Sequence, residues 1–218
     1  METVAIIPVR KNSQRIKNKN FKDFYNGKSL LEIKINQIKD SNVFSRVILT
    51  SDCSVAKDIA KSFNIEFINR NSEFANATTP WPKVVTHILS QIQGNPMVAW
   101  TLVTAPLFHR FNEALIHLTK SKKHDSLIAV LPKKTFLIHE SGKGINFNPG
   151  LWHPYSQQLE TYYEITGSLF MGKKEDMQNW SYWYGPKPCL FPVSNFEAVD
   201  IDNEDDFKLA QVLFNSKQ

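Results

Sequence analysis

Two groups of charged residues in this sequence have types and spacings that suit phosphate chemistry. The first follows an apolar stretch at residues 4–9 and supplies Arg10, Arg15 and Lys19, with Ser13 among them. Arginine offers forked donors to phosphate oxygens, and lysine offers a compact charge. Since the loop after the first strand of a parallel sheet lies at the ligand-binding edge, we expect this basic loop to surround a polyphosphate. A solvated basic loop without a ligand is the alternative.

The second group is the pair Asp200 and Asp202 near the carboxyl end. In a strand, residues two apart point to the same side, so both carboxylates would share one face while Ile201 faces the core. Two carboxylates make a hard oxygen site for Mg²⁺ or Mn²⁺. The alternative is that these acids cap a helix that we predict from about 203 to 214. Together, the basic loop and the acid pair predict one cleft that holds a metal–polyphosphate complex.

Composition and motifs narrow the function classes. The chain has neither GxxxxGKS nor GxGxxG, which disfavours a P-loop and a dinucleotide site. A net charge of +5 favours anionic partners. The two cysteines, Cys53 and Cys189, lie far apart and outside any CxxC pair, so we expect no zinc site, no disulfide framework and a cytoplasmic location. We expect no membrane partner, because no apolar segment is long enough to span a bilayer.

The elements that must position these residues alternate along the chain. Apolar β-branched runs predict strands, and runs of helical spacing between them predict helices. The expected strands lie at 4–9, 46–50, 65–68, 97–103 and 126–131, and the expected helices at 30–38, 52–63, 83–93 and 111–121. Ser51 or Asp52 is expected to cap the second helix. This order predicts an α/β fold of three layers, a mostly parallel sheet flanked by helices.

The sequence predicts a single domain over residues 1–218 with one irregular insertion. From residue 132 to about 190, aromatic residues, glycines and prolines become frequent, around one further strand at 165–171. Clustered aromatic residues favour interfaces. We therefore expect this insertion to form part of the site wall and a small oligomer-forming arm.

The chain resembles the sialic-acid-activating cytidylyltransferases, the family of CMP-acylneuraminate synthetases and their CMP-octulosonate relatives. The matching segments occur in family order over nearly the whole chain: IIPVRKNSQRIKNKN, GKSLLEIKI, VILTSD, INRNSEFA, LVTAPL, TGSLFM and AVDIDNEDDFKLAQ. The resemblance implies a Rossmann-like nucleotidyltransferase that uses CTP, an acidic keto-sugar and Mg²⁺ or Mn²⁺. The sugar's anomeric hydroxyl would attack the α-phosphorus and release pyrophosphate. It also implies a homodimer whose arm reaches the partner's site, with no nucleic-acid partner.

The same resemblance assigns roles to individual residues. Those expected to be catalytic are Arg10, Lys19 and Asp202, and the expected metal ligands are Asp200 and Asp202. The expected nucleotide contacts are Arg10, Ser13, Arg15, Lys19, Asn20, Arg70, Thr78 and Thr79. The candidate sugar contacts are Thr104, Gln157, Gln158, Thr166 and Phe170.

Departures from the family pattern fall on the sugar side. Leu102 and Val103 stand where relatives often have a glutamine and a proline, and Glu164 stands where many have an arginine. CMP transfer to a sialic-acid-like nonulosonate is therefore the main expectation. The same chemistry with an octulosonate or a phosphonate acceptor is the alternative. A non-catalytic polyanion-binding module is a third hypothesis, motivated by the +5 charge, and it predicts nucleic-acid affinity that falls steeply with salt.

Overall fold

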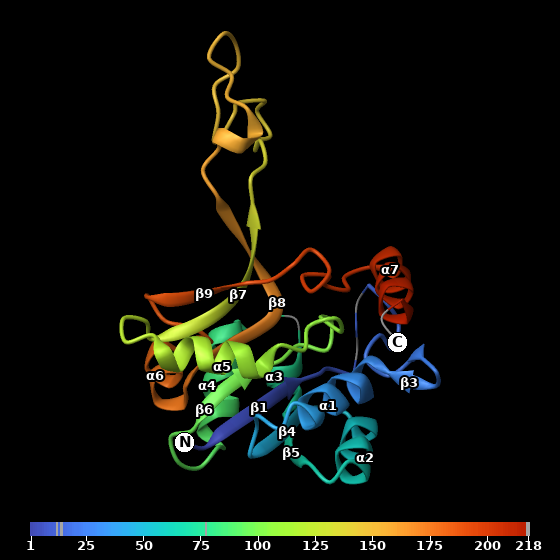
Figure 1. Ribbon diagram of the computed structural model, residues 1–218. Helices are drawn as coiled ribbons and strands as arrows, with labels where there is room; N and C mark the ends of the chain where they lie inside the picture. The colour runs from blue at the N-terminus through green and yellow to red at the C-terminus, as the bar shows by residue number, and fades with distance from the viewer. Residues whose placement is uncertain (12, 14, 77, 217–218) are drawn as a thin grey trace.

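A computed structural model describes residues 1–218 except 12, 14, 77 and 217–218, and its main sheet has seven strands in the order β5-β4-β1-β6-β8-β7-β9 (Figure 1). The strands are β1 (Thr3–Pro8), β4 (Arg46–Ser51), β5 (Glu66–Asn69), β6 (Met97–Trp100), β7 (Ser126–Lys133), β8 (Tyr162–Lys173) and β9 (Pro188–Pro192). Within the described sheet only β8 runs against the others, because it pairs antiparallel with both β6 and β7. The predicted mostly parallel sheet is confirmed.

Helices cover both faces of the sheet and give the predicted three layers. One face packs on α1 (Leu30–Asp40), α2 (Ser54–Ser62), α5 (Phe111–Lys120) and α7 (Glu204–Asn215), and the other on α4 (Trp81–Ser90) and α6 (Lys174–Trp180). Strand β1 shows the reason, since Ala5 and Ile7 belong to the first core and Val4 and Ile6 to the second. All four are fully buried, as expected for a central strand covered on both faces. Shorter elements are β2 (Asp23–Tyr25), β3 (Lys28–Ser29), α3 (Ser72–Ala75) and the 3₁₀ turn η1 (Ser156–Gln158).

The helix starts agree with the sequence only in part. The helix predicted from about 203 to 214 is α7, and its N-cap is Asn203, which forms a capping box with Asp206, rather than Asp200 or Asp202. The prediction that Ser51 or Asp52 caps α2 is wrong, because Cys53 occupies the N-cap position without a side-chain cap. The Ser51 hydroxyl accepts from the Cys53 amide, while the Asp52 carboxylate accepts from the Lys11 amide at 2.9 Å. Asp52 thus holds the basic loop rather than the helix.

Two predicted strands are shorter or absent. Strand β6 ends at Trp100, because Thr101 turns its hydroxyl onto the Ile6 carbonyl and the chain then leaves the sheet. Residues 200–202 are not a strand. They form a loop segment that hydrogen-bonds to the 101–108 loop, with the Ile201 amide donating to the Thr104 carbonyl at 2.9 Å. Ile201 is nevertheless fully buried in the core, as the alternation predicted.

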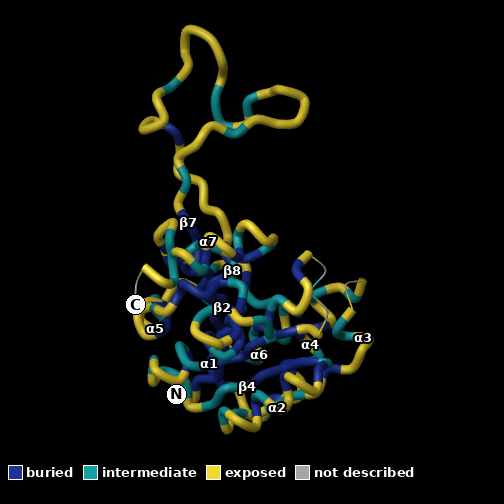
Figure 2. Tube along the Cα trace, turned by 90° about the vertical axis from the view of Figure 1, so that its right-hand side faces the viewer, coloured by how far each residue is buried: buried dark blue, intermediate teal, exposed yellow. Residues whose placement is uncertain are grey.

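The insertion is narrower than the predicted 132–190. Pairing of β7 with β8 runs outward to Lys133 and Tyr162, and the chain between these ends stands away from the body as an arm (Figure 1). Figure 2 shows that the arm is mostly exposed, whereas the sheet is buried. Residues 166–173 of β8 lie inside the main sheet instead, and Met177 of α6 lies in its core.

Candidate active site

A cleft of about 590 Å³ opens beside the ends of β1, β5 and β6, a size typical of small-ligand sites. Its polar lining is Arg10, Ser13, Arg15, Lys19, Asn20, Arg70, Asn76, Thr78, Thr79 and Thr104. Its apolar lining is Pro8, Val9, Phe74, Pro80, Trp81, Val84, Leu102, Val103 and Trp183. All eight residues predicted to contact a nucleotide therefore line one cleft, at the edge of the sheet where ligands of open α/β folds bind.

The basic loop is fixed to the body by side-chain contacts at both ends. The buried Asn20 side chain donates to the Arg10 carbonyl at 3.2 Å, and the backbone carbonyl of Asn20 accepts from the Leu31 amide in the first turn of α1. The exposed Arg10 guanidinium lies within 3.5 Å of the Asn76 carbonyl across the cleft. The loop thus presents its cations to the cleft while its backbone is tied to α1.

The basic loop meets the acid pair. The Lys19 ammonium donates to the Ile201 carbonyl at 2.5 Å, and Arg15 forms an ion pair with Asp202 at 2.6 Å. Burial lowers the pKa of Lys19, and the nearby carboxylates of Asp200 and Asp202 oppose that shift. The predicted convergence of the amino-terminal cations and the carboxyl-terminal acids is therefore present in the structure, with the acids at the border of the cleft.

The acid pair fits a cation that arrives with a phosphate. Within the described residues no group of three or more His, Cys, Asp or Glu side chains could hold a metal. Mg²⁺ needs less, because it is usually bound by one or two carboxylates together with substrate phosphates and water. The Arg15–Asp202 pair is exposed on both sides, at 65% and 49%, so it is worth only about 0–1 kcal/mol and can exchange.

Arg70 is the buried cation of the site. Its side chain is 2% exposed and donates to the Val9 carbonyl, while its Nε has no partner within the described residues. Burial lowers its pKa to about 10, which still leaves it charged at neutral pH. A charged guanidinium in the wall of a cleft is suited to an anionic ligand.

One side chain, that of Asn76, holds Thr78 and Thr79 in place. The Asn76 carboxamide oxygen accepts from the amides of Thr78 and Thr79 and from the Thr78 hydroxyl. The Thr79 hydroxyl donates to the Glu73 carbonyl. Both hydroxyl protons are therefore engaged inside the loop, and their oxygens remain available as acceptors at the cleft.

The candidate sugar contacts are scattered. Thr104 lines the cleft, but Thr166 and Phe170 are not among its described lining residues. The Thr166 hydroxyl donates to the Ala129 carbonyl, and Phe170 is buried against Trp183 with ring centroids 4.3 Å apart. Gln157 and Gln158 lie in the arm, away from the cleft of their own chain (Figure 1).

Two tryptophans that the sequence analysis did not name as site residues line the cleft, although Trp183 lies in the 132–190 insertion expected to form part of the site wall. Trp81 begins α4 and Trp183 follows α6, yet their ring centroids are 4.7 Å apart. The aromatic residues of that insertion were expected to favour an interface, whereas the ring of Trp183 stacks on the buried Phe170 and so also packs on the core. Nothing in the spacing of positions 81 and 183 signals that they meet, since the contact arises because both side chains pack on the same face of the sheet.

Comparison with known proteins identifies the family. A family model described as Cytidylyltransferase matches residues 4–123, more than half of the chain. The chain belongs to this cytidylyltransferase family. It is therefore a nucleotidyltransferase enzyme, and the hypothesis of a non-catalytic polyanion-binding module is set aside.

Relatives of this cytidylyltransferase extend over its full length. Pseudaminic acid cytidylyltransferase of Campylobacter jejuni is 24% identical and covers 98% of this chain and 97% of its own. N-acylneuraminate cytidylyltransferase of Escherichia coli is also 24% identical, over 98% of this chain and 52% of its own. A solved CMP:2-keto-3-deoxy-manno-octonic acid synthetase complexed with CTP has a TM-score of 0.72 at 10% identity, with 100% of both chains covered. The similarity to this solved structure shows that the two proteins share a fold.

Proposed function

We propose that this cytidylyltransferase transfers CMP from CTP to the anomeric hydroxyl of an acidic nonulosonate sugar and releases pyrophosphate. The proposal rests on the contacts that Arg15 and Lys19 of the cleft make with the 200–202 segment, an ion pair to Asp202 and a hydrogen bond to the Ile201 carbonyl. It provides cations for a triphosphate beside carboxylates for its divalent ion. Relatives that match nearly all of this chain and are named for pseudaminic acid and N-acylneuraminate support the acceptor class.

The chemistry assigned to the chain needs no covalent intermediate with the protein. The acceptor oxygen bonds to the α-phosphorus, the bond from that phosphorus to the bridging oxygen breaks, and the hydroxyl proton leaves to solvent. Pyrophosphate gathers negative charge as it departs, and Arg10 and Lys19 stabilise that charge in the transition state. Asp200 and Asp202 would hold Mg²⁺ or Mn²⁺, which when bound neutralises phosphate charge and lowers the pKa of a nearby hydroxyl.

Topology divides the cleft into two halves. Arg70 follows β5, and Thr78 and Thr79 come later in the chain, so these nucleotide contacts lie on the β4–β5 side of β1. Leu102 follows β6, and Trp183 stacks on Phe170 of β8, so the apolar wall lies on the other side. A Cβ placed on Gly167 would lie 3.3 Å from Leu102 and 3.4 Å from the Asp200 carboxylate. The apolar wall thus adjoins the acid pair, where the acceptor must approach.

The character of this wall favours a particular acceptor. Leu102, Trp81 and Trp183 offer apolar surface, which suits deoxy positions and acyl methyl groups rather than a chain of hydroxyls. A nonulosonate that carries N-acyl groups meets this requirement, and an octulosonate without them meets it less well. The octulosonate and phosphonate acceptors remain the alternatives to be tested.

We further infer a homodimer in the cytoplasm. The arm exposes large apolar side chains, among them Leu151 at 100% and Trp152 at 90%, which is unusual for a surface that stays in water.

Cys53 and Cys189 are both free, in keeping with a reducing compartment. Among the described helices none has the length and apolar character needed to cross a bilayer.

The test is an acceptor panel. The protein is mixed with CTP, Mg²⁺ and one sugar at a time, namely a di-N-acyl nonulosonate, N-acetylneuraminate, a 3-deoxy-octulosonate or a phosphonate, and pyrophosphate is measured. We expect release with the N-acylated nonulosonates and little with the others. Release with the octulosonate or the phosphonate alone would reject the acceptor, and thermal stabilisation by ATP, GTP or UTP in preference to CTP would reject the nucleotide.

A further inference from the structure

A lysine lies inside the core beneath the cleft. Lys34 of α1 is fully buried, on the helix face that also buries Leu30 and Ile38. Its ammonium donates to the Ala105 carbonyl at 2.8 Å and to the Phe108 carbonyl at 3.4 Å. Within the described residues no carboxylate forms an ion pair with it, so these two carbonyls are its polar partners.

Such a residue is costly for the fold. A charged group away from water is strongly disfavoured unless it is paired, and burial alone lowers the pKa of Lys34 to about 7. An apolar residue of similar length would fill the same space without that cost. A lysine at this position is therefore best explained by what its two hydrogen bonds hold.

These bonds hold the loop that borders the cleft. Leu102, Val103 and Thr104 line the cleft, and Ala105 turns back to hydrogen-bond to Leu102. The next turn of α1 adds a second tie, because the Gln37 side chain donates to the Pro106 carbonyl at 2.6 Å. Helix α1 thus fixes this loop through three carbonyls, those of Ala105, Pro106 and Phe108.

The loop in turn holds the acid segment. The Thr104 carbonyl, next to Ala105, accepts from the Ile201 amide at 2.9 Å. Ile201 separates Asp200 from Asp202, and its own carbonyl accepts from Lys19. Hydrogen bonds and neighbouring residues therefore connect Lys34, through the loop, to the backbone segment that carries the Asp200 and Asp202 carboxylates.

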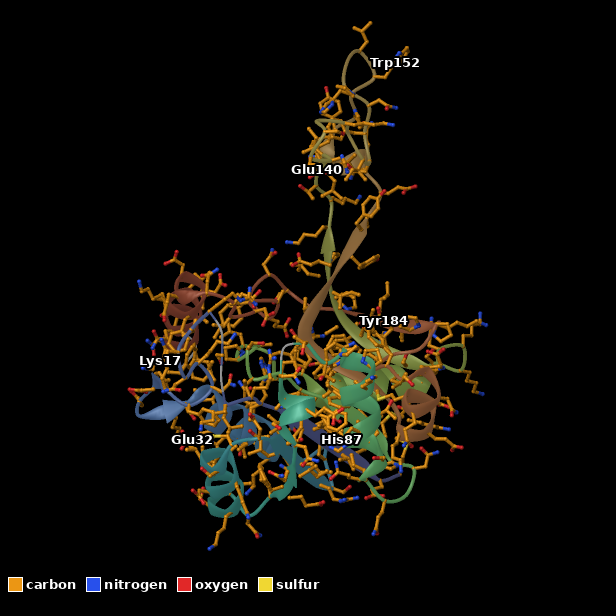
Figure 3. All side chains as sticks on the ribbon, turned by 180° about the vertical axis from the view of Figure 1, so that it is seen from behind. Lys17, Glu32, His87, Glu140, Trp152 and Tyr184 are labelled. Atoms are coloured by element: carbon orange, nitrogen blue, oxygen red, sulfur yellow. The ribbon has the colours of Figure 1, made fainter. Side chains whose placement is uncertain are left out.

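The same helix also holds the basic loop. One turn before Lys34, the Leu31 amide donates to the Asn20 carbonyl, and Asn20 holds the Arg10 carbonyl. Figure 1 shows α1 lying across the sheet near the ends that carry both loops, and Glu32, labelled in Figure 3, marks its first turn. Helix α1 is thus the shared support of the cations and the acids.

We propose that Lys34 is a positioning residue, which sets the spacing between the acid segment and the basic loop by pinning the 105–108 backbone to α1. Lys34 does not touch the substrate. The proposal rests on cytidylyl transfer in this cleft and not on the identity of the acceptor. It predicts that losing the two bonds leaves the nucleotide contacts in place but misaligns the acids.

The experiment compares Lys34→Met with Lys39→Met. Lys39 lies on the same helix, but its ammonium donates to the Phe63 carbonyl on the far side from the loop. In Lys34→Met we expect kcat to fall about 10- to 100-fold with KM for CTP nearly unchanged, the pattern of lost alignment rather than lost binding. Lys39→Met should match the unmodified protein in both constants.

Amide hydrogen exchange gives a second measurement that needs no acceptor. In Lys34→Met the Ile201 amide should exchange faster, while the Ile6 amide in central β1 keeps its protection. Faster exchange at both would indicate general destabilisation and overturn the proposal, as would a folded Lys34→Met with unchanged kcat and unchanged Ile201 exchange. Should Lys34→Met not fold, Gln37→Leu removes the neighbouring bond to Pro106 and is expected to change the same two quantities in the same direction.

A failure of the acceptor assignment is distinguishable from a failure of this proposal. If no sugar of the panel reacts, the exchange comparison still decides the role of Lys34. If the sugars react and Ile201 exchange is unaffected in Lys34→Met, the proposed acceptor stands and the positioning role is rejected.

Discussion

At the scale of residues, the site is built from contacts that a ligand can replace. Arg15 and Asp202 pair across the border of the cleft, and both are half-exposed or more. Such a pair contributes little to folding. In the proposed reaction, a triphosphate would take the cation of this pair and a divalent ion would take the carboxylate. Asp202 can therefore be changed with little effect on the fold.

Asp202→Asn tests that separation of roles. We expect kcat to fall about 100-fold or more, since a charged contact used in the transition state is lost, while the melting temperature stays within a few degrees. The measurements are pyrophosphate release as a function of Mg²⁺ and thermal unfolding. Asp205→Asn is the matched control, because Asp205 is exposed and its side chain makes no contact with the basic loop in the described structure. Equal activity of Asp202→Asn and the unmodified protein would remove Asp202 from the site.

Individual residues were predictable from sequence where the chain order itself places them. Arg10, Ser13 and Lys19 follow the first strand directly, so the switch in topology at β1 brings them to the cleft. Trp81 and Trp183 were not predictable, because their contact depends on how α4 and the chain after α6 pack on the same sheet face.

At the scale of elements, alternation of apolar strands and amphipathic helices was enough to give the layers and most of the sheet. It failed at residues 200–202, where alternation is real but the hydrogen bonds go to a loop instead of a strand. Lys34 could have been noticed, since it interrupts the apolar positions Leu30 and Ile38 at a spacing of four residues. A polar residue on such a stripe indicates either exposure or a specific buried role.

The buried lysine also gives the fold a pH dependence. The pKa of Lys34 falls from its ordinary value of 10.5 to about 7, so between these values the unfolded chain binds more protons than the folded one. The free energy of unfolding should therefore rise as pH increases from about 7 towards 10, by up to ~1.4 kcal/mol per pH unit from this group. Below pH 7 both states hold the proton and the contribution is constant.

Denaturant unfolding of the unmodified protein and Lys34→Met at several pH values measures this effect. Because other groups titrate in both proteins, the measured quantity is the difference between their free energies of unfolding. We expect the free energy of unfolding of the unmodified protein to increase relative to that of the variant as pH rises. Lys39→Met, in which an exposed lysine is removed, should show no such trend. A difference that stays constant from pH 7 to 10 would show that burial does not perturb Lys34.

At the scale of the whole molecule, the arm is the feature that one chain does not explain. The sequence indicated an aromatic-rich insertion, but its extent was overestimated because the strand at 162–173 serves both the arm and the body. Figure 3 shows Trp152 at the far end of the arm, well away from the sheet. Exposed apolar groups such as Leu151 and Trp152 gain free energy only when a second surface covers them.

The proposed homodimer makes a direct prediction about the tip of the arm. Replacing both Leu151 and Trp152 with serine should convert a dimer into a monomer in sedimentation velocity at micromolar concentration. The monomer should keep its circular dichroism spectrum, because these side chains are 100% and 90% exposed in the single chain and support none of its core. Lys143→Ser, an exposed change in the same arm, should leave the dimer intact. If the unmodified protein sediments as a monomer, or if the double variant remains a dimer, the arm has another role. A monomeric variant that also loses turnover would indicate that the partner's arm completes the cleft.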